Sequence, residues 1–159
     1  PAMRNALREN GPDVQDGGAE DGGQLHDLAR LVFQSFQRLL EHRTMVHDVS
    51  ASQWSFLRQL WRTDGICQRE LANRLGISEA TATIALRRLE EKGFVSRWRN
   101  AGNRREMLVF PTRRTQALEA VLIPLARDVH VLATQDFTAA EVATLERLLR
   151  SVIANLAAA

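Results

Sequence analysis

The sequence predicts a mainly α-helical protein that contains one small β-hairpin. Apolar residues recur at helical spacing through most of its 159 residues. Near the middle of the chain, two short helical patterns meet at a glycine-containing turn, and two short runs of β-branched and aromatic residues follow them. A chain of this length fits one domain of ordinary size. We therefore expect a single structural unit in which helices flank a hairpin.

The N-terminal region divides into two parts. Residues 1–22 are rich in glycine and acidic residues and have no apolar period, so we expect them to form a disordered tail. Farther along, Leu28, Val32 and Phe36 fall on one face of a long amphipathic helix. A stripe of this kind needs a partner, and residues 23–48 are therefore expected to form an N-terminal dimerisation helix.

A capping box predicts how the central region, residues 49–112, begins. Ser50 and Gln53 have the spacing at which each side chain can bond the backbone amide of the other residue. A short helix is expected to follow over about residues 51–62, with Leu57 among the apolar residues of its inner face.

Two helices joined by a tight turn come next. The first unit begins at Ile66 and Cys67, with Cys67 at the cap, and its helix of two turns is stopped by Gly76. The second helix begins at Ser78, whose side chain is a favourable N-cap. Two helices joined in this way form a helix-turn-helix. Residues 94–98 and 107–110 then predict two short strands around a basic turn. A hairpin directly behind a helix-turn-helix is the wing of a winged helix.

Long amphipathic helices are predicted over residues 113–159. Helical apolar spacing continues across Pro124, which removes one backbone donor and should bend the helix. Thr138 and Glu141 form a capping box at the start of a last helix with a wide apolar face. Together with the N-terminal stripe, these faces exceed what a small winged helix can cover. We expect the C-terminal helices to dimerise as well, against a second copy of the chain.

Charge is distributed unevenly along the chain. The formal net charge is only +2, but residues 58–114 hold 13 arginine and lysine residues against 6 acidic ones, a local charge of +7. The basic region coincides with the helix-turn-helix and its hairpin. This distribution favours a nucleic-acid partner.

Several other function classes find no support in the sequence. The four histidines and the single cysteine, Cys67, show no metal-ligand spacing, so no metal or cofactor is expected. There is no nucleophile elbow or glycine-rich phosphate loop, and an enzyme is not expected. No run approaches the roughly 18 apolar residues of a membrane span, and no signal-peptide pattern occurs. We expect a cytoplasmic protein.

The central motifs resemble those of the MarR family of bacterial regulators. The residues that carry the resemblance are Gln68, Glu70, Leu71, Ala72, Leu75, Gly76, Ile77 and Ser78, followed by Leu89, Glu90, Gly93, Val95 and Arg97. By pattern and placement of the outer helices, it extends over about residues 24–157. The resemblance implies a winged helix-turn-helix with long dimerisation helices, and a transcriptional regulator that binds double-stranded DNA as a homodimer.

Three positions depart from the family pattern. Asn103 stands where the wing usually has aspartate, so the ionic brace of the nearby arginine becomes at best a neutral hydrogen bond. Cys67 replaces the usual threonine and is a weaker helix cap. Residues 110–114 replace the usual end of the second strand, which leaves the start of the following helix open.

The resemblance and the geometry of a helix-turn-helix together predict the DNA contacts. A recognition helix reaches base edges in the major groove, while basic and hydroxyl groups hold phosphates. The predicted contacts are Ser78, Thr81, Thr83, Arg87 and Arg88 on the recognition helix, and Arg104 and Arg105 on the wing. Either wing arginine is a candidate for the minor groove. A two-fold dimer requires a palindromic operator with half-sites roughly 34 Å apart.

Family resemblance further implies a repressor that a small aromatic or anionic ligand releases from DNA. A ligand that binds only one arrangement of the dimer shifts the population toward that arrangement. Arginine would pair with a ligand carboxylate, and tryptophan would supply an aromatic wall. The residues expected at this pocket are His42, Arg43, His47, Trp54 and Arg58, whose alternative roles are core, surface or interface.

Two other functions stay open at this point. A winged-helix dimer can have an architectural or protein-assembly role without operator specificity, because the fold alone does not decide function. Alternatively, Cys67 at a helix N-terminus can make the regulator responsive to thiol oxidation, with an inert helix cap as the simpler role.

Overall fold

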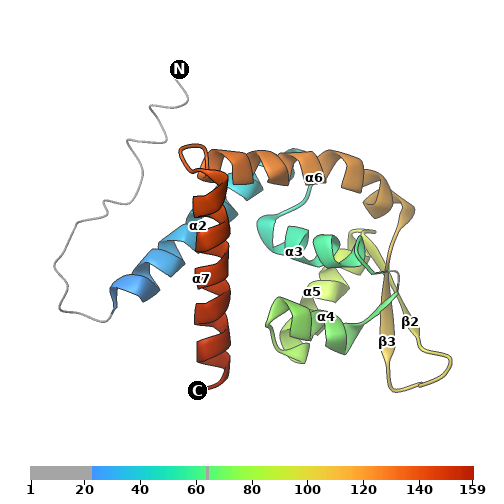
Figure 1. Cartoon of the computed structure of the whole chain (residues 1–159). Helices are drawn as coiled ribbons and strands as arrows, with labels where there is room; N and C mark the ends of the chain where they lie inside the picture. Colours follow the sequence, from blue (N-terminus) through green and yellow to red (C-terminus); the bar gives the residue numbers. More distant parts are fainter. Residues whose placement is uncertain (1–22, 64) are drawn as a thin grey trace.

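The computed structural model describes residues 23–63 and 65–159, and the tail expected over residues 1–22 lies outside this part. The elements in chain order are α2 (Gln24–Thr44), the 3-10 helix η1 (Met45–His47), α3 (Ala51–Leu60), β1 (Ile66–Cys67), α4 (Gln68–Leu75), α5 (Glu79–Glu91), β2 (Val95–Arg99), β3 (Met107–Pro111), α6 (Arg113–Ala133) and α7 (Ala139–Ala157). Figure 1 shows α3, α4, α5 and the hairpin gathered in one unit, with α2, α6 and α7 outside it. The predicted winged helix-turn-helix with long flanking helices is confirmed.

The wing belongs to a three-stranded antiparallel sheet with the strand order β1-β3-β2. Within the hairpin Arg97 pairs with Val109, and on the other side of β3 the same Val109 pairs with Ile66 of β1. The sequence did not predict β1, whereas Cys67, expected to cap the following helix, is the N-cap of α4, which begins at Gln68. A strand of two residues is too short to show a period of two.

The turn between α4 and α5 depends on one glycine. Gly76 has a φ of 64°, in the left-handed region where a residue with a Cβ is strained. The amide of Ile77 then donates to the carbonyl of Ala72 at 3.1 Å, which closes the end of α4. Ser78 caps α5 as predicted, because its Oγ accepts from the amide of Thr81 at 3.1 Å. These bonds fix how α5 follows α4.

Other helix starts also follow the predicted caps. Both capping boxes are present, Ser50 with Gln53 in front of α3 and Thr138 with Glu141 in front of α7. Hydrogen bonds from the amide and the hydroxyl of Thr138 hold the pKa of Glu141 below its ordinary value of 4.5. The start of α6, which the sequence left open, is set by Thr112, whose Oγ1 accepts from the amide three residues ahead. α6 then continues through Pro124.

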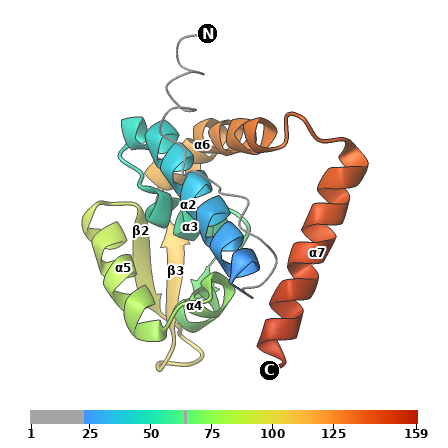
Figure 2. The same ribbon diagram turned by 90° about the vertical axis from the view of Figure 1, so that its left-hand side faces the viewer.

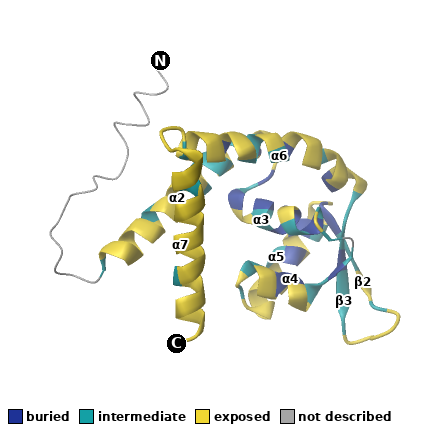
Figure 3. Cartoon of the chain, in the orientation of Figure 1, coloured by how far each residue is buried: buried dark blue, intermediate teal, exposed yellow. Residues whose placement is uncertain are grey.

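The core lies between α3, the helix-turn-helix, the sheet and α6 (Figure 3). Its buried side chains include Leu57, Leu60, Leu71, Leu86, Leu89, Phe94, Val109 and Leu122. The indole Nε1 of Trp61 donates to the carbonyl of Thr115 at 2.9 Å, and the Thr115 hydroxyl donates to the carbonyl of Phe94. These buried polar groups are therefore paired, and they tie α6 to α3 and to the start of the hairpin.

Asp48 joins three elements around the end of α5. It has a φ of 61°, which is uncommon for a residue with a side chain. Its carboxylate lies 3.3 Å from Nζ of Lys92 and 3.6 Å from Nη2 of Arg114. Arg114 also places its guanidinium carbon 4.4 Å from the ring centre of Phe94, a cation-π geometry. The junction of α2 and α3 is thereby connected to the C-terminal end of α5 and the start of α6.

The outer helices expose much of their apolar surface in the single protomer (Figure 3). The exposed residues include Leu25, Leu28, Val32, Phe33 and Phe36 on α2, Val121, Val131 and Leu132 on α6, and Leu145, Leu148, Leu149, Ile153 and Leu156 on α7. No residue of α7 is buried, and Figure 2 shows this helix standing away from the winged unit. Within the described residues, none of the helices combines the length and apolar character needed to cross a bilayer. Exposed apolar faces of this extent are typical of interfaces between chains.

Replacing Gly65 with alanine is expected to destabilise the protein more than the same change at Gly76. Their φ angles are 70° and 64°, so each alanine carries backbone strain of about 1–2 kcal/mol. At Gly65 a Cβ would also lie 2.5 Å from Cε1 of Phe110, whereas at Gly76 it would meet nothing within 4 Å. Overpacking of this kind adds roughly 1–3 kcal/mol. Urea unfolding measures the difference, and equal losses would mean that the Phe110 ring moves aside at no cost.

Candidate nucleic-acid interface

The outward face of α5 carries most of the predicted contact residues. Ala82, Leu86 and Leu89 are buried, so the opposite side of the helix points away from the core. The exposed residues of that side include Thr81, Thr83, Ile84, Arg87 and Arg88. Figure 2 shows α5 at the outer edge of the molecule, on the side away from α7. The helix is therefore open to a large partner.

The hydroxyls of Ser78 and Thr81 meet at the N-terminus of α5. Ser78 Oγ lies 2.9 Å from Thr81 Oγ1 and also accepts from the Thr81 amide. Each hydroxyl carries one hydrogen, and only one of the two is used between them. The pair therefore keeps one hydrogen for an outside acceptor, at a helix end that favours negative charge. This arrangement suits a phosphate oxygen.

Thr83 lies on the exposed surface of α5, but its hydroxyl is already engaged. It donates to the carbonyl of Glu79 at 2.8 Å and accepts from Nε2 of Gln68, also at 2.8 Å. The only hydrogen of this hydroxyl is thus committed within the protein. Gln68 was not among the predicted site residues. It lies in the motif that carries the family resemblance, but a motif does not reveal a side-chain contact made with another helix.

The arginines fall into two groups according to their partners. In the first group each guanidinium faces a carboxylate, as in the pair of Arg97 with Glu90 at 2.6 Å. Arg97 is only 18% exposed, and its two hydrogen bonds to one Glu90 oxygen join β2 to α5. In the second group, the guanidinium groups of Arg87, Arg88, Arg104 and Arg105 have no ion-pair or hydrogen-bond partner within residues 23–63 and 65–159. The positive charges of the predicted contact residues are therefore uncompensated.

The loop of the wing is held in shape by two asparagines. Nδ2 of Asn100 donates to Oε2 of Glu106 at 3.0 Å, and Oδ1 of Asn103 accepts from the amide of Arg105 at 3.2 Å. The bond of Asn103 is neutral, as expected, but it goes to the backbone and not to an arginine side chain. Arg104 and Arg105 are both exposed. The loop is thus ordered by its own polar groups while its arginines point to solvent.

The residues predicted for an effector pocket have different surroundings. Trp54 is 6% exposed and packs edge-on against Trp61, with ring centres 5.6 Å apart. It contributes to the core, where its indole face is covered. The other four are half-buried, Arg43 and His47, or exposed, His42 and Arg58. The effector pocket stays a prediction.

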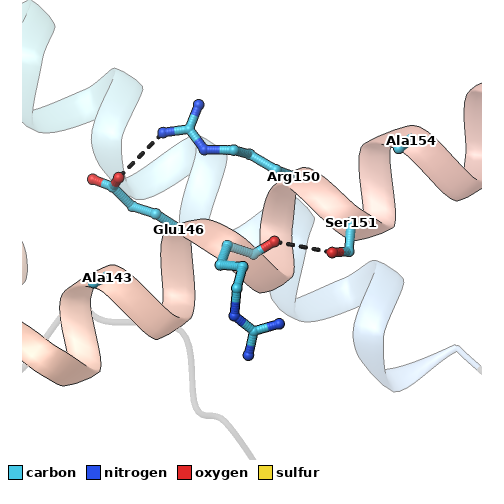
Figure 4. A pocket seen from close by; sticks show the side chains of 6 residues that line it. Ala143, Glu146, Arg150, Ser151 and Ala154 are labelled. Atoms are coloured by element: carbon cyan, nitrogen blue, oxygen red, sulfur yellow. Dashed lines mark hydrogen bonds and ion pairs between the residues drawn. The ribbon is translucent and has the colours of Figure 1, made fainter.

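A hollow of about 430 Å³ lies on α7 (Figure 4). It is lined by Ala143, Glu146, Arg147, Arg150, Ser151 and Ala154, all from this one helix. Arg150 pairs with Glu146 at 3.2 Å, and the Ser151 hydroxyl donates to the carbonyl of Arg147 at 3.1 Å. None of the lining residues is buried, so the hollow is part of an exposed helix face.

Metal and thiol chemistry have little support in the described part of the chain. No group of three or more histidine, cysteine, aspartate or glutamate residues that could hold a metal ion occurs there. Cys67 is a free, half-buried cysteine at the N-cap of α4, where its side chain makes no capping hydrogen bond. The weaker cap expected at this position is therefore observed, while a redox role of the thiol stays a prediction.

Comparisons with known proteins agree on one family. The MarR family model matches residues 49–107. The multiple antibiotic resistance protein MarR of Escherichia coli is 34% identical over 127 residues, which are 79% of this chain and 88% of that protein. A crystal structure of a cysteine-to-serine mutant of Escherichia coli MarR complexed with operator DNA shares 31% identity, has a TM-score of 0.74, and matches over 84% of this chain and 99% of that one. The apo form of wild-type MarR shares 34% identity, with a TM-score of 0.67 over 80% and 96% of the two chains.

The similarity extends beyond the winged helix to the flanking helices, because the matched segments cover most of both chains. The family resemblance of the sequence is therefore confirmed. Members of this family regulate transcription and are not enzymes, which also confirms the class of function expected from the sequence. The chain belongs to the MarR family of transcriptional regulators.

Proposed function

We propose that the protein regulates transcription by binding double-stranded DNA through α5 and the wing. The proposal rests on Arg87, Arg88, Arg104 and Arg105, which lie on α5 and the wing and have no carboxylate partner within the described residues. Phosphates are their natural partners, because arginines that neutralise phosphates release counterions from DNA. The resemblance to a MarR structure that contains operator DNA supports the same conclusion.

The two elements suit the two grooves of B-DNA. An α-helix fits the major groove, where arginine can bond O6 and N7 of guanine, and Arg87 is the residue we assign to a base. Arg88 and the free hydroxyl hydrogen of Ser78 and Thr81 are assigned to phosphates. Arginine is attracted by the potential of a narrow minor groove, so one of the wing arginines is assigned there.

The functional unit is proposed to be a homodimer on a palindromic operator. The exposed apolar residues of α2, α6 and α7 need a cover, and a second copy offers the same faces. Two recognition helices related by a two-fold axis then meet half-sites about one DNA turn, roughly 34 Å, apart. Only an inverted repeat presents the same base contacts to both recognition helices.

The form of regulation is proposed to be repression that a small aromatic or anionic ligand relieves. Such a ligand acts by its higher affinity for a dimer whose recognition helices are wrongly spaced for DNA. The half-buried Arg43 supplies a cation that can pair with a ligand carboxylate, and His42, His47 and Arg58 are the other polar candidates. Trp54, which is 6% exposed, is assigned to the core.

Binding to two duplexes over a range of salt tests the proposal. The upstream intergenic DNA of the protein's own gene is expected to bind at least about a thousandfold tighter than a random duplex of equal length. Arg87→Ala is expected to weaken operator binding by about 5- to 150-fold with little effect on the random duplex. Arg105→Ala is expected to weaken both and to lower the salt slope by about 1 if it holds a phosphate.

Arg147→Ala provides the matched control, because this exposed arginine lies on α7, far from the winged unit in Figure 2. It should bind both duplexes as the wild type does. Equal affinity of the wild type for the two duplexes would instead favour an architectural role, and no binding to either would favour protein assembly.

A further inference from the structure

Ile84 is a large apolar residue on the mostly polar outer surface of α5. It is 59% exposed. It lies two residues from both Ala82 and Leu86, which are buried, and therefore projects from the opposite side of α5. Its neighbours one turn away are Arg87 and Arg88, which have no carboxylate partner within the described residues. The side chain has no packing role in the protomer that explains its presence there.

Thr83, the adjacent residue, is effectively a second apolar group. Its hydroxyl hydrogen is donated to the carbonyl of Glu79, and Nε2 of Gln68 takes one of the oxygen's lone pairs. It therefore has no hydrogen left for a phosphate or for the acceptors of guanine and adenine. What Thr83 still presents to a partner is its methyl group and one lone pair. Gln68 acts here as a positioning residue.

We propose that Thr83 and Ile84 determine specificity by contacting the C5-methyl groups of thymine in the major groove. Thymine is the only base that presents a methyl group there. Against any other base, an apolar side chain would strip water from donors or acceptors without replacing the hydrogen bonds, which is unfavourable. The inference rests on the proposed DNA-binding function and deepens it. It predicts thymines at the centre of each half-site, beside the base that Arg87 contacts.

Deleting single methyl groups from protein and DNA tests this assignment. A duplex is first selected by the full-length wild-type protein from a randomised pool, and each thymine is then replaced singly by uracil, which removes only the C5-methyl. In each half-site, one thymine is expected to contact Thr83 and another to contact Ile84. Replacing either thymine by uracil should weaken wild-type binding roughly fourfold. Thr83→Ser keeps the hydroxyl and loses the methyl, whereas Thr83→Val keeps the methyl and loses the hydroxyl.

Each substitution that removes a methyl contact is expected to abolish the effect of uracil at one thymine position. Thr83→Ser should bind the thymine and uracil duplexes equally at one position, and Ile84→Ala should do so at another, while Thr83→Val should keep the wild-type penalty at both. Thr83 and Ile84 are both exposed, so the melting temperatures of all three variants should stay near that of the wild type.

Three outcomes would overturn the proposal. If the uracil penalties of Thr83→Ser and Ile84→Ala match those of the wild type at every position, the methyl contacts do not exist. If Thr83→Val weakens binding to specific and random duplexes alike, Thr83 holds a phosphate. If the pool yields no enriched duplex, sequence-specific DNA binding fails as well, which separates that failure from the loss of the methyl contacts alone.

Discussion

A Leu149→Glu protein is expected to be monomeric and to bind its upstream DNA at least about a thousandfold more weakly than the wild type. Leu149 is 45% exposed in the protomer and no residue of α7 is buried, so the change leaves the protomer core intact. In a two-fold dimer the substitution occurs twice and buries two unpaired carboxylates, which costs several kcal/mol for each. A monomer keeps one recognition helix and one wing, and it loses the contribution of the second half-site.

Sedimentation velocity and DNA binding measure the two effects separately. Ser151→Glu is the matched control, since it adds the same charge to the same helix at an exposed position near the opposite side. This variant should remain dimeric and bind as the wild type does. If Leu149→Glu stayed dimeric at micromolar concentration, α7 would not form the interface.

Phe94→Ala is expected to lower the free energy of unfolding by about 3–5 kcal/mol. Phe94 is fully buried, with 0% of its surface exposed, and its ring also receives the Arg114 guanidinium at 4.4 Å. The substitution removes the largest fully buried side chain of the described residues, at the point where α5, the hairpin and α6 meet, and it leaves Arg114 without its aromatic partner. Because domains are typically stable by only about 5–15 kcal/mol, the loss is a large fraction of the total.

Urea unfolding at equilibrium measures this loss. Trp98→Ala is the control, because Trp98 is an aromatic residue of the hairpin that is 64% exposed. Its truncation should change the free energy of unfolding by no more than about 0.5 kcal/mol. Similar losses in the two variants would contradict the assignment of Phe94 to the centre of the core.

Much of the fold could be predicted because its signals are local. A helix cap and its partner lie within one turn, so Ser50 and Thr138 predicted the starts of α3 and α7 correctly. Gly76 and Ser78 predicted the turn between α4 and α5 for the same reason. Strand β1 could not be predicted, because Ile66 becomes a strand residue only by pairing with Val109, much later in the chain.

The surface positions of the candidate contact residues could be predicted from the sequence, but the hydrogen bonds of their side chains could not. Helical spacing places Thr83 on the outer surface, yet only the structure reveals that Gln68 engages its hydroxyl. A count of arginines likewise cannot separate Arg97, which Glu90 neutralises, from Arg87, which has no such partner in the described chain. In both cases the hydrogen-bond or ion-pair partner lies on a different helix or strand. A single sequence does not reveal how close two side chains on different elements lie.

The division of the arginines into paired and unpaired groups bears on how such a regulator can evolve. Arg97 and Glu90 join the hairpin to α5, so a change at either disturbs the protomer. Ile84 and Arg87 have exposed side chains outside the core, and substitutions at such positions usually alter stability by no more than about 0.5 kcal/mol. In the proposed mode of DNA binding, duplicated copies of the gene can therefore acquire new target sites by mutation at these positions, without compensating changes elsewhere in the fold.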